Sequence, residues 1–75
     1  MHTTIETRVF DSSGELLEVE TNETIADAKA FLPAIADGCA WAIEKRTVHE
    51  RTGAPDSYRT IATGGNAEAL QAAGF

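Results

Sequence analysis

Apolar and polar residues alternate along two neighbouring runs near the start of the chain. Residues 3–10 (TTIETRVF) place Ile5, Thr7 and Val9 on one face of an extended chain. The turn-forming sequence DSSG follows, and residues 15–21 (ELLEVET) alternate again. A period of two is typical of a half-buried strand, and Asp, Ser and Gly favour a tight turn. The pattern therefore predicts a β-hairpin.

The outer face of this hairpin is predicted to be acidic. In the second run, Leu17 and Val19 face one way, whereas Glu18 and Glu20 face the other. We expect Glu6 of the first run to share a face with Glu18 and Glu20. This row of carboxylates is a candidate surface for a basic groove of a partner protein, and a merely solvated face would have the same pattern.

A helical pattern follows at residues 24–38 (TIADAKAFLPAIADG). Thr24 with Asp27 three residues later resembles a capping box, and Gly38 is expected to cap the C-terminal end. The apolar stripe of this helix consists of Ile25, Ala28, Leu32 and Ile35. Pro33 cannot donate a backbone hydrogen bond, so we expect it to kink the helix or to divide it in two.

Residues 39–52 (CAWAIEKRTVHERT) predict a long strand in which Trp41 and Ile43 share one face. Val48 is out of phase with these two residues, which predicts a β-bulge near residues 45–46.

A second hairpin is predicted from this strand, a turn at residues 53–57 (GAPDS) and a partner strand at residues 58–63 (YRTIAT). Alternation in the partner strand predicts two faces. One face carries Tyr58, Thr60 and Ala62, and the other carries Arg59, Ile61 and Thr63. The residues expected to form cross-strand charge pairs are Lys45, Arg46, Glu50 and Arg59.

The end of the chain predicts a short helix. Asn66 is a suitable N-cap for the sequence AEALQAA, with Leu70 and Phe75 as its large apolar anchors. The order of elements is then ββαββα. We predict a single α+β domain over residues 1–75, with a four-stranded antiparallel sheet, one main helix packed across one face and a short C-terminal helix.

The composition leaves this domain short of core-forming side chains. Among 75 residues, Leu, Ile, Val and Phe together number fifteen, and alanine alone numbers thirteen. A small domain with a thin core commonly gains stability from a partner subunit. We therefore expect a homo-oligomer, most simply a two-fold dimer.

The net charge of −6 is unevenly distributed. Residues 1–38 carry eight acidic and two basic side chains, whereas residues 39–75 carry four of each. Such a chain repels the phosphates of nucleic acids, so direct DNA or RNA binding is not expected. The acidity fits attraction to a basic protein partner, and it fits a role in solubility equally well.

The chain offers no residue set typical of a catalytic, cofactor or metal site. Cys39 is the only cysteine, so neither an internal disulfide nor a Cys/His zinc site is expected. His49 lies among charged residues in a strand, which favours a solvated histidine over a general base. The start of the chain, MHTTIETRVF, does not resemble a signal peptide, and no apolar run is long enough to span a membrane. We expect a cytoplasmic, non-enzymatic protein without a cofactor or membrane contact.

Trp41 and Tyr58 are the only tryptophan and tyrosine of the chain. Each is interpreted either as a core residue or as an anchor for a partner, since both residue types are enriched in interface hot spots. The candidate partner-binding residues are therefore Glu6, Glu18, Glu20, Trp41 and Tyr58.

The hairpin–helix–hairpin order, with TIADAKAFL as the helix and WAIEKRTV as the following strand, resembles the layout of many small accessory proteins from phages and mobile elements. The resemblance covers about residues 3–63. Some of those proteins bind and inhibit host machinery, including complexes that handle nucleic acids. The likeness is one of layout, so no functional residue is carried over from it.

Three hypotheses follow. The first is a small, non-enzymatic, self-associating protein-binding module. The alternative is an acidic inhibitor or nucleic-acid mimic that occupies a basic groove of a partner. The third is a small enzyme or ligand carrier built at a subunit interface around His49, Tyr58 and Arg59.

Overall fold

The computed structural model describes residues 2–48 and 58–75, and it confirms the predicted α+β fold. The predicted turn at 53–57, together with His49 and Glu50, lies outside the described residues. In chain order the elements are β1 (His2–Phe10), β2 (Leu16–Asn22), α1 (Ile25–Phe31), the 3-10 turn η1 (Leu32–Ala34), β3 (Ala40–Val48), β4 (Arg59–Gly65) and α2 (Ala67–Ala72).

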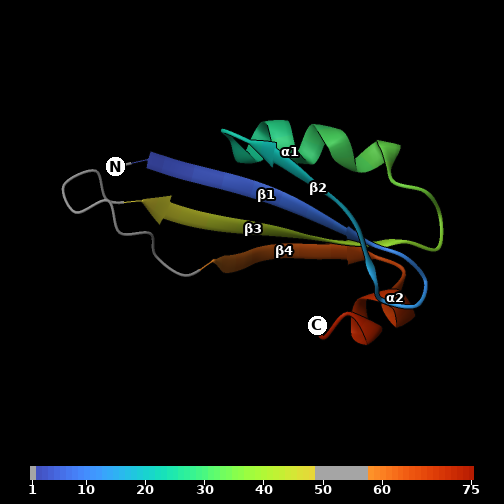
Figure 1. The fold of residues 1–75 in the computed structure, drawn as a ribbon. Helices are drawn as coiled ribbons and strands as arrows, with labels where there is room; N and C mark the ends of the chain where they lie inside the picture. Colours follow the sequence, from blue (N-terminus) through green and yellow to red (C-terminus); the bar gives the residue numbers. More distant parts are fainter. Residues whose placement is uncertain (1, 49–57) are drawn as a thin grey trace.

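The four strands form one antiparallel sheet in the order β2-β1-β3-β4. Strands β1 and β3 are therefore central, and β2 and β4 are the edges. The two helices lie on opposite sides of the sheet, with α1 above it and α2 below one end of it in Figure 1. We call these sides the α1 face, which carries Ile5 and Val9, and the α2 face, which carries Glu6 and Phe10.

Three residues from three elements form the centre of the core on the α1 face. Ile5 of β1, Ile43 of β3 and Ala28 of α1 are almost completely buried. The partly buried side chains that pack around them are Leu32, Trp41 and Ala62. The period-two pattern of the strands and the stripe of the helix thus meet as predicted. Fully burying an isoleucine stabilises the fold by about 1.5–3 kcal/mol.

Both ends of α1 follow from local sequence. The hydroxyl oxygen of Thr24 accepts a hydrogen bond from the backbone N–H of Asp27 at 3.1 Å, which confirms the predicted N-cap. Pro33 divides the predicted helix, because α1 ends at Phe31 and the chain continues as the 3-10 turn. Proline suits the start of that turn because it has no N–H to leave unpaired.

The predicted helix cap at Gly38 is wrong. Since Pro33 ends the helical segment early, Gly38 lies beyond it, in a turn that leads into β3. The N–H of Cys39 donates to the carbonyl of Ala36 at 3.2 Å and closes this turn. Gly38 has a φ of +86°, which only glycine adopts readily.

The hairpin of β1 and β2 forms as predicted, but its register contradicts the expected acidic face. Glu18 and Glu20 pair with the buried Val9 and Thr7, so they lie on the α1 face, whereas Glu6 lies on the α2 face. A register difference of one residue exchanges the two faces of a strand. Alternation within each strand does not fix the phase between them, and for this reason the sequence did not separate Glu6 from the other two.

The bulge expected near residues 45–46 of β3 is also wrong. Along its whole length β3 pairs with β1 without a shift. The register shifts instead against β4, where Ile61 is the extra residue between Thr60 and Ala62. Thr60 and Ala62 therefore lie on opposite faces of the sheet. A bulge can occupy either strand of a pair, and the apolar pattern of β3 alone does not say which.

The same register changes the predicted charge pairs. Lys45 lies directly opposite Arg59, so these two basic residues face each other across the strands. Like charges in this position are destabilising rather than stabilising. Lys45 and Arg59 therefore do not form an attractive pair with each other, and Glu50 lies outside the described residues.

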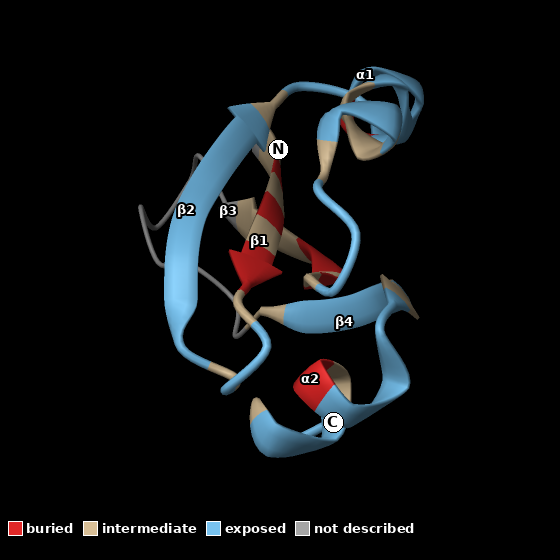
Figure 2. Cartoon of the chain, turned by 90° about the vertical axis from the view of Figure 1, so that its right-hand side faces the viewer, coloured by how far each residue is buried: buried red, intermediate tan, exposed pale blue. Residues whose placement is uncertain are grey.

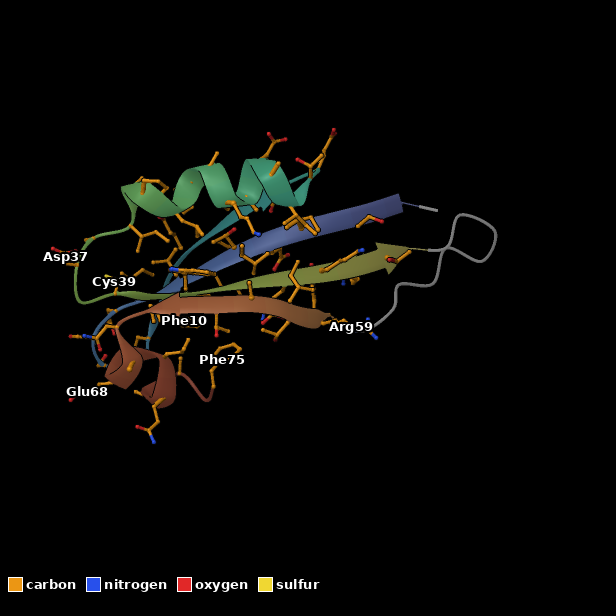
Figure 3. The ribbon with its side chains drawn as sticks, turned by 180° about the vertical axis from the view of Figure 1, so that it is seen from behind. Phe10, Asp37, Cys39, Arg59, Glu68 and Phe75 are labelled. Carbon is orange, nitrogen blue, oxygen red and sulfur yellow. The ribbon has the colours of Figure 1, made fainter. Side chains whose placement is uncertain are left out.

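Helix α2 covers one end of the α2 face. The side-chain oxygen of Asn66 accepts a hydrogen bond from the N–H of Ala69 at 3.0 Å, which confirms the predicted N-cap. Beyond the helix, the ring of Phe75 lies 5.8 Å from that of Phe10 between centroids (Figure 3). Gly14 of the β1–β2 turn approaches α2 so closely that a Cβ there would lie 2.5 Å from the helix backbone. These contacts attach the C-terminus to the first hairpin.

We predict that Ile43→Ala lowers the free energy of unfolding by about 2–5 kcal/mol, because it leaves a cavity at the centre of a small core. Ile61→Ala is the matched control, since this isoleucine is exposed in the β4 bulge. The control should change stability by about 0.5 kcal/mol or less. Urea unfolding at one fixed protein concentration measures both. Equal losses in the two variants would contradict the placement of the core.

Candidate partner-binding surface

Two of the predicted partner-binding residues, Glu6 and Tyr58, are bonded to each other. Tyr58 lies just before β4, and its hydroxyl donates to Oε2 of Glu6 on β1 at 2.5 Å. The other carboxylate oxygen of Glu6 accepts from Nε and Nη2 of Arg8, at 3.3 and 3.2 Å. Glu6 and Arg8 are two residues apart on one strand and so share a face. Both oxygens of Glu6 are thus engaged within the protein.

Two guanidinium groups lie against the ring of Tyr58. The Cζ atom of Arg8 is 5.0 Å from the ring centroid, and that of Arg46 on β3 is 4.4 Å from it. Cation–π contacts of this kind contribute about 0.5–1 kcal/mol where the site is partly exposed. The prediction that Arg46 joins a cross-strand charge pair stays a prediction, because its candidate partner Glu50 lies outside the described residues.

The same face holds a second carboxylate. Glu44 of β3 lies directly opposite Glu6 in the β1–β3 register and is only 4% exposed. Its Oε2 accepts a hydrogen bond from the hydroxyl of Thr60 at 2.8 Å. Facing carboxylates repel, and a buried charge requires partners. The nearby cations Arg8 and Arg46 offset this repulsion.

These six residues form one unit across three strands, which we call the tyrosine cluster: Glu6, Arg8, Glu44, Arg46, Tyr58 and Thr60. The cluster ties the start of β4 to β1 and β3. Sequence reasoning did not find it, because Tyr58 and Glu6 are 52 residues apart. The only local signal was the spacing of Glu6 and Arg8.

The cluster raises the pKa of Tyr58 above its ordinary value of 10.0. The hydrogen bond to Glu6 is the largest cause, because it requires the phenol to keep its proton. Partial burial and the negative charge of Glu6 act in the same direction, whereas Arg46 and Arg8 lower the pKa. Tyr58 is therefore held neutral as a hydrogen-bond donor.

Trp41 lies on the α1 face and packs against the core. Its register partners are Val9 of β1 and Gly64 of β4. A Cβ on Gly64 would come 2.4 Å from Cζ2 of the indole, so the ring lies directly over this glycine. Glycine within a strand often marks such a close approach. The geometry agrees with the core interpretation of Trp41.

Glu18 and Glu20 remain on the surface, on the edge strand β2. Every residue of this strand except Asn22 is exposed, as the continuous pale blue of β2 in Figure 2 shows. Its large apolar side chains share this exposure: Leu16 is 54% exposed, Leu17 is 58% exposed and Val19 is 43% exposed. We call the outer edge of residues 16–21 the β2 edge.

The other edge of the sheet differs from the β2 edge. Strand β4 is interrupted by the bulge at Ile61 and ends in Gly64 and Gly65, of which Gly65 has a φ of +89°. Bulges and irregular ends make an edge a poor template for a further strand. Strand β2 also has one register shift, with Leu17 as the extra residue between Leu16 and Glu18, and it pairs regularly with β1 from Glu18 to Asn22. Each edge thus carries one irregularity, and the β2 edge differs from the β4 edge by its exposed carboxylates and its large exposed apolar side chains.

The described residues contain no group of three or more His, Cys, Asp or Glu side chains placed to hold a metal ion together. Both helices in the described part of the chain are too short and too polar to form a membrane-spanning segment.

We predict that the phenol of Tyr58 titrates with a midpoint above 10.0 and that Glu6→Gln moves the midpoint back toward this value. Because Tyr58 is the only tyrosine, tyrosinate absorbance reports on it alone. The folded pKa is raised, so the free energy of unfolding should fall as pH rises from 10.0 toward the folded pKa. Glu18→Gln, on the opposite face, should leave the midpoint unchanged. A midpoint insensitive to Glu6 would contradict the bond.

No protein-family model, no curated protein and no solved structure matches this chain. The layout resemblance to phage accessory proteins stays a prediction.

Proposed function

We propose that this chain is a small, non-enzymatic protein-binding module that contacts its partner through the β2 edge. The observation that carries the proposal is the exposure of Leu16, Leu17 and Val19 on an edge strand. Large apolar side chains grouped on a surface mark sites of protein interaction. Exposed backbone groups at a strand edge add hydrogen-bonding capacity to the same site.

The arrangement of the ionisable groups supports a binding role rather than a catalytic one. The hydroxyl of Tyr58 donates a hydrogen bond to Glu6, and the hydroxyl of Thr60 donates one to Glu44. A general base or nucleophile must instead be free to reach a substrate. The tyrosine cluster thus has the character of a structural network that keeps the sheet in register.

The charge of the binding surface favours a basic partner. Exposed carboxylates follow the β2 edge and its two flanking turns: Glu15, Glu18, Glu20 and Glu23. A positively charged partner would be attracted over a distance of about one Debye length, roughly 8 Å at physiological salt. The alternative function, an acidic inhibitor or nucleic-acid mimic for a basic groove, uses the same carboxylates without Glu6.

We also propose that the chain associates with further copies of itself and that it is cytoplasmic. In the part of the chain that the structure describes, half of the buried apolar residues are alanines: Ala28, Ala40, Ala42 and Ala69. The other buried apolar residues there are Ile5, Val9, Phe10 and Ile43. A core of this kind supplies limited hydrophobic stabilisation. On the α2 face, Phe75 is 45% exposed beside Phe10, whose partner across the strands is the exposed Leu16. A second copy could cover this apolar group.

We expect Leu17→Ser and Val19→Ser each to weaken capture of the partner from a lysate of the source cells by about tenfold, which corresponds to about 1.4 kcal/mol. Ile61→Ser, on the opposite edge, is the matched control and should retain the partner. Immobilised wild-type and variant chains, followed by mass spectrometry of the bound proteins, measure this. Capture that is equal for all four chains would reject the β2 edge as the binding surface.

Self-association predicts a concentration-dependent molecular mass in sedimentation equilibrium. Phe75→Ser should shift the chain toward the monomer because it removes an exposed ring from the apolar group on the α2 face. Glu68→Ser is the control, since Glu68 points away from the sheet on α2 (Figure 3). A wild-type chain that stays at monomer mass at every concentration would exclude self-association.

A further inference from the structure

The β2 edge has a different chemical character on each of its two sides. Glu18 and Glu20 lie on the α1 face, and Val19 lies on the α2 face as the register partner of Arg8. The edge is exposed and, within the described residues, β2 pairs only with β1. An extended chain placed along it would therefore meet a row of carboxylates on one side and apolar side chains on the other.

A second copy of the same strand does not fit this edge. When two antiparallel strands pair, directly opposite side chains lie on the same side of the sheet. In a two-fold pair of β2 strands, Glu18 and Glu20 of one copy would therefore face the same two residues of the other. Like charges directly opposite are destabilising, and charged edges of this kind prevent edge-to-edge self-pairing.

A strand of complementary charge fits the edge on both sides. Lys or Arg at every second position would face Glu18 and Glu20, and a β-branched residue between them would cover Val19. We infer that the β2 edge binds an extended segment of a partner protein, with alternating basic and apolar residues, as an added strand of the sheet. This inference rests on the proposed function, because it specifies which part of the partner the module recognises. Main-chain hydrogen bonds would supply affinity, and the alternating side chains would supply selectivity.

The β4 edge would not accept the same segment. Arg59 lies opposite Lys45 on this side of the sheet, so a basic segment would meet like charge there. The regular part of the β2 edge, from Glu18 to Asn22, carries carboxylates instead. Charge therefore directs a basic strand to β2.

The test uses three capped peptides and the full chain. The first peptide, Thr-Lys-Val-Lys-Val-Lys-Thr, has the alternating pattern. The second, Thr-Lys-Lys-Lys-Val-Val-Thr, has the same composition with its charges grouped, and the third replaces each Lys of the first by Glu. We expect the alternating basic peptide to bind about tenfold more tightly than either of the others in fluorescence anisotropy. Backbone amide shifts in NMR spectra should then change along residues 16–21 and not along residues 60–64.

Charge reversal provides the matched variants. Glu18→Lys and Glu20→Lys together should weaken the alternating basic peptide by about tenfold or more and should create binding of the acidic peptide. Glu68→Lys alters an exposed carboxylate on α2 and should change neither affinity. The emission of Trp41, the only tryptophan, verifies that each variant remains folded.

Two results would overturn the inference. Equal binding of the alternating and grouped peptides would mean that net charge alone is recognised, and amide shifts along residues 60–64 would place the segment on the wrong edge. If either occurs while capture of the natural partner still depends on Val19, strand addition is wrong and the proposed function stands. If capture is also independent of Leu17 and Val19, the proposed function fails as well.

Discussion

The pairing of β1 with β3 is the constraint on which the rest of the structure depends. These two central strands pair without a shift, and that register brings Ile5 and Ile43 together beneath Ala28 of α1. Among the described residues, the largest fully buried side chains are those of Ile5, Ile43 and Thr7. With so few large residues in the core, a slip of one position would expose most of the buried apolar surface and bury charged side chains in its place.

The same register assembles the opposite face. It places Glu6 opposite Glu44, a repulsive arrangement that persists because Arg8, Tyr58 and Thr60 supply hydrogen bonds and Arg46 supplies a nearby positive charge. The side chains of the tyrosine cluster therefore attach β4 to the central strands of the sheet. The surface that we propose for recognition, the β2 edge, consists of exposed side chains that lie outside the tyrosine cluster.

The two edges of the sheet differ in the features that limit the addition of further strands. An unpaired strand edge invites association with other chains, and proteins limit this with bulges or with charge. Strand β4 carries a bulge at Ile61, and strand β2 carries one at Leu17. Strand β2 also exposes Glu18 and Glu20, and under our proposal these carboxylates repel like strands and attract basic ones. A charged edge can thus prevent aggregation and select a partner at the same time.

The sequence by itself determined the features that depend on neighbouring residues. The α+β class, the hairpin at the start, the caps at Thr24 and Asn66 and the division of the helix at Pro33 were predictable, because each follows from alternation or from a hydrogen bond a few residues away. Only the tertiary structure decided the phase between β1 and β2, which places Glu6 on the opposite face from Glu18 and Glu20. It also decided that the bulge lies in β4 and that Tyr58 meets Glu6. These features depend on register and on contacts between residues far apart in the chain, and a pattern within one strand carries no information about either.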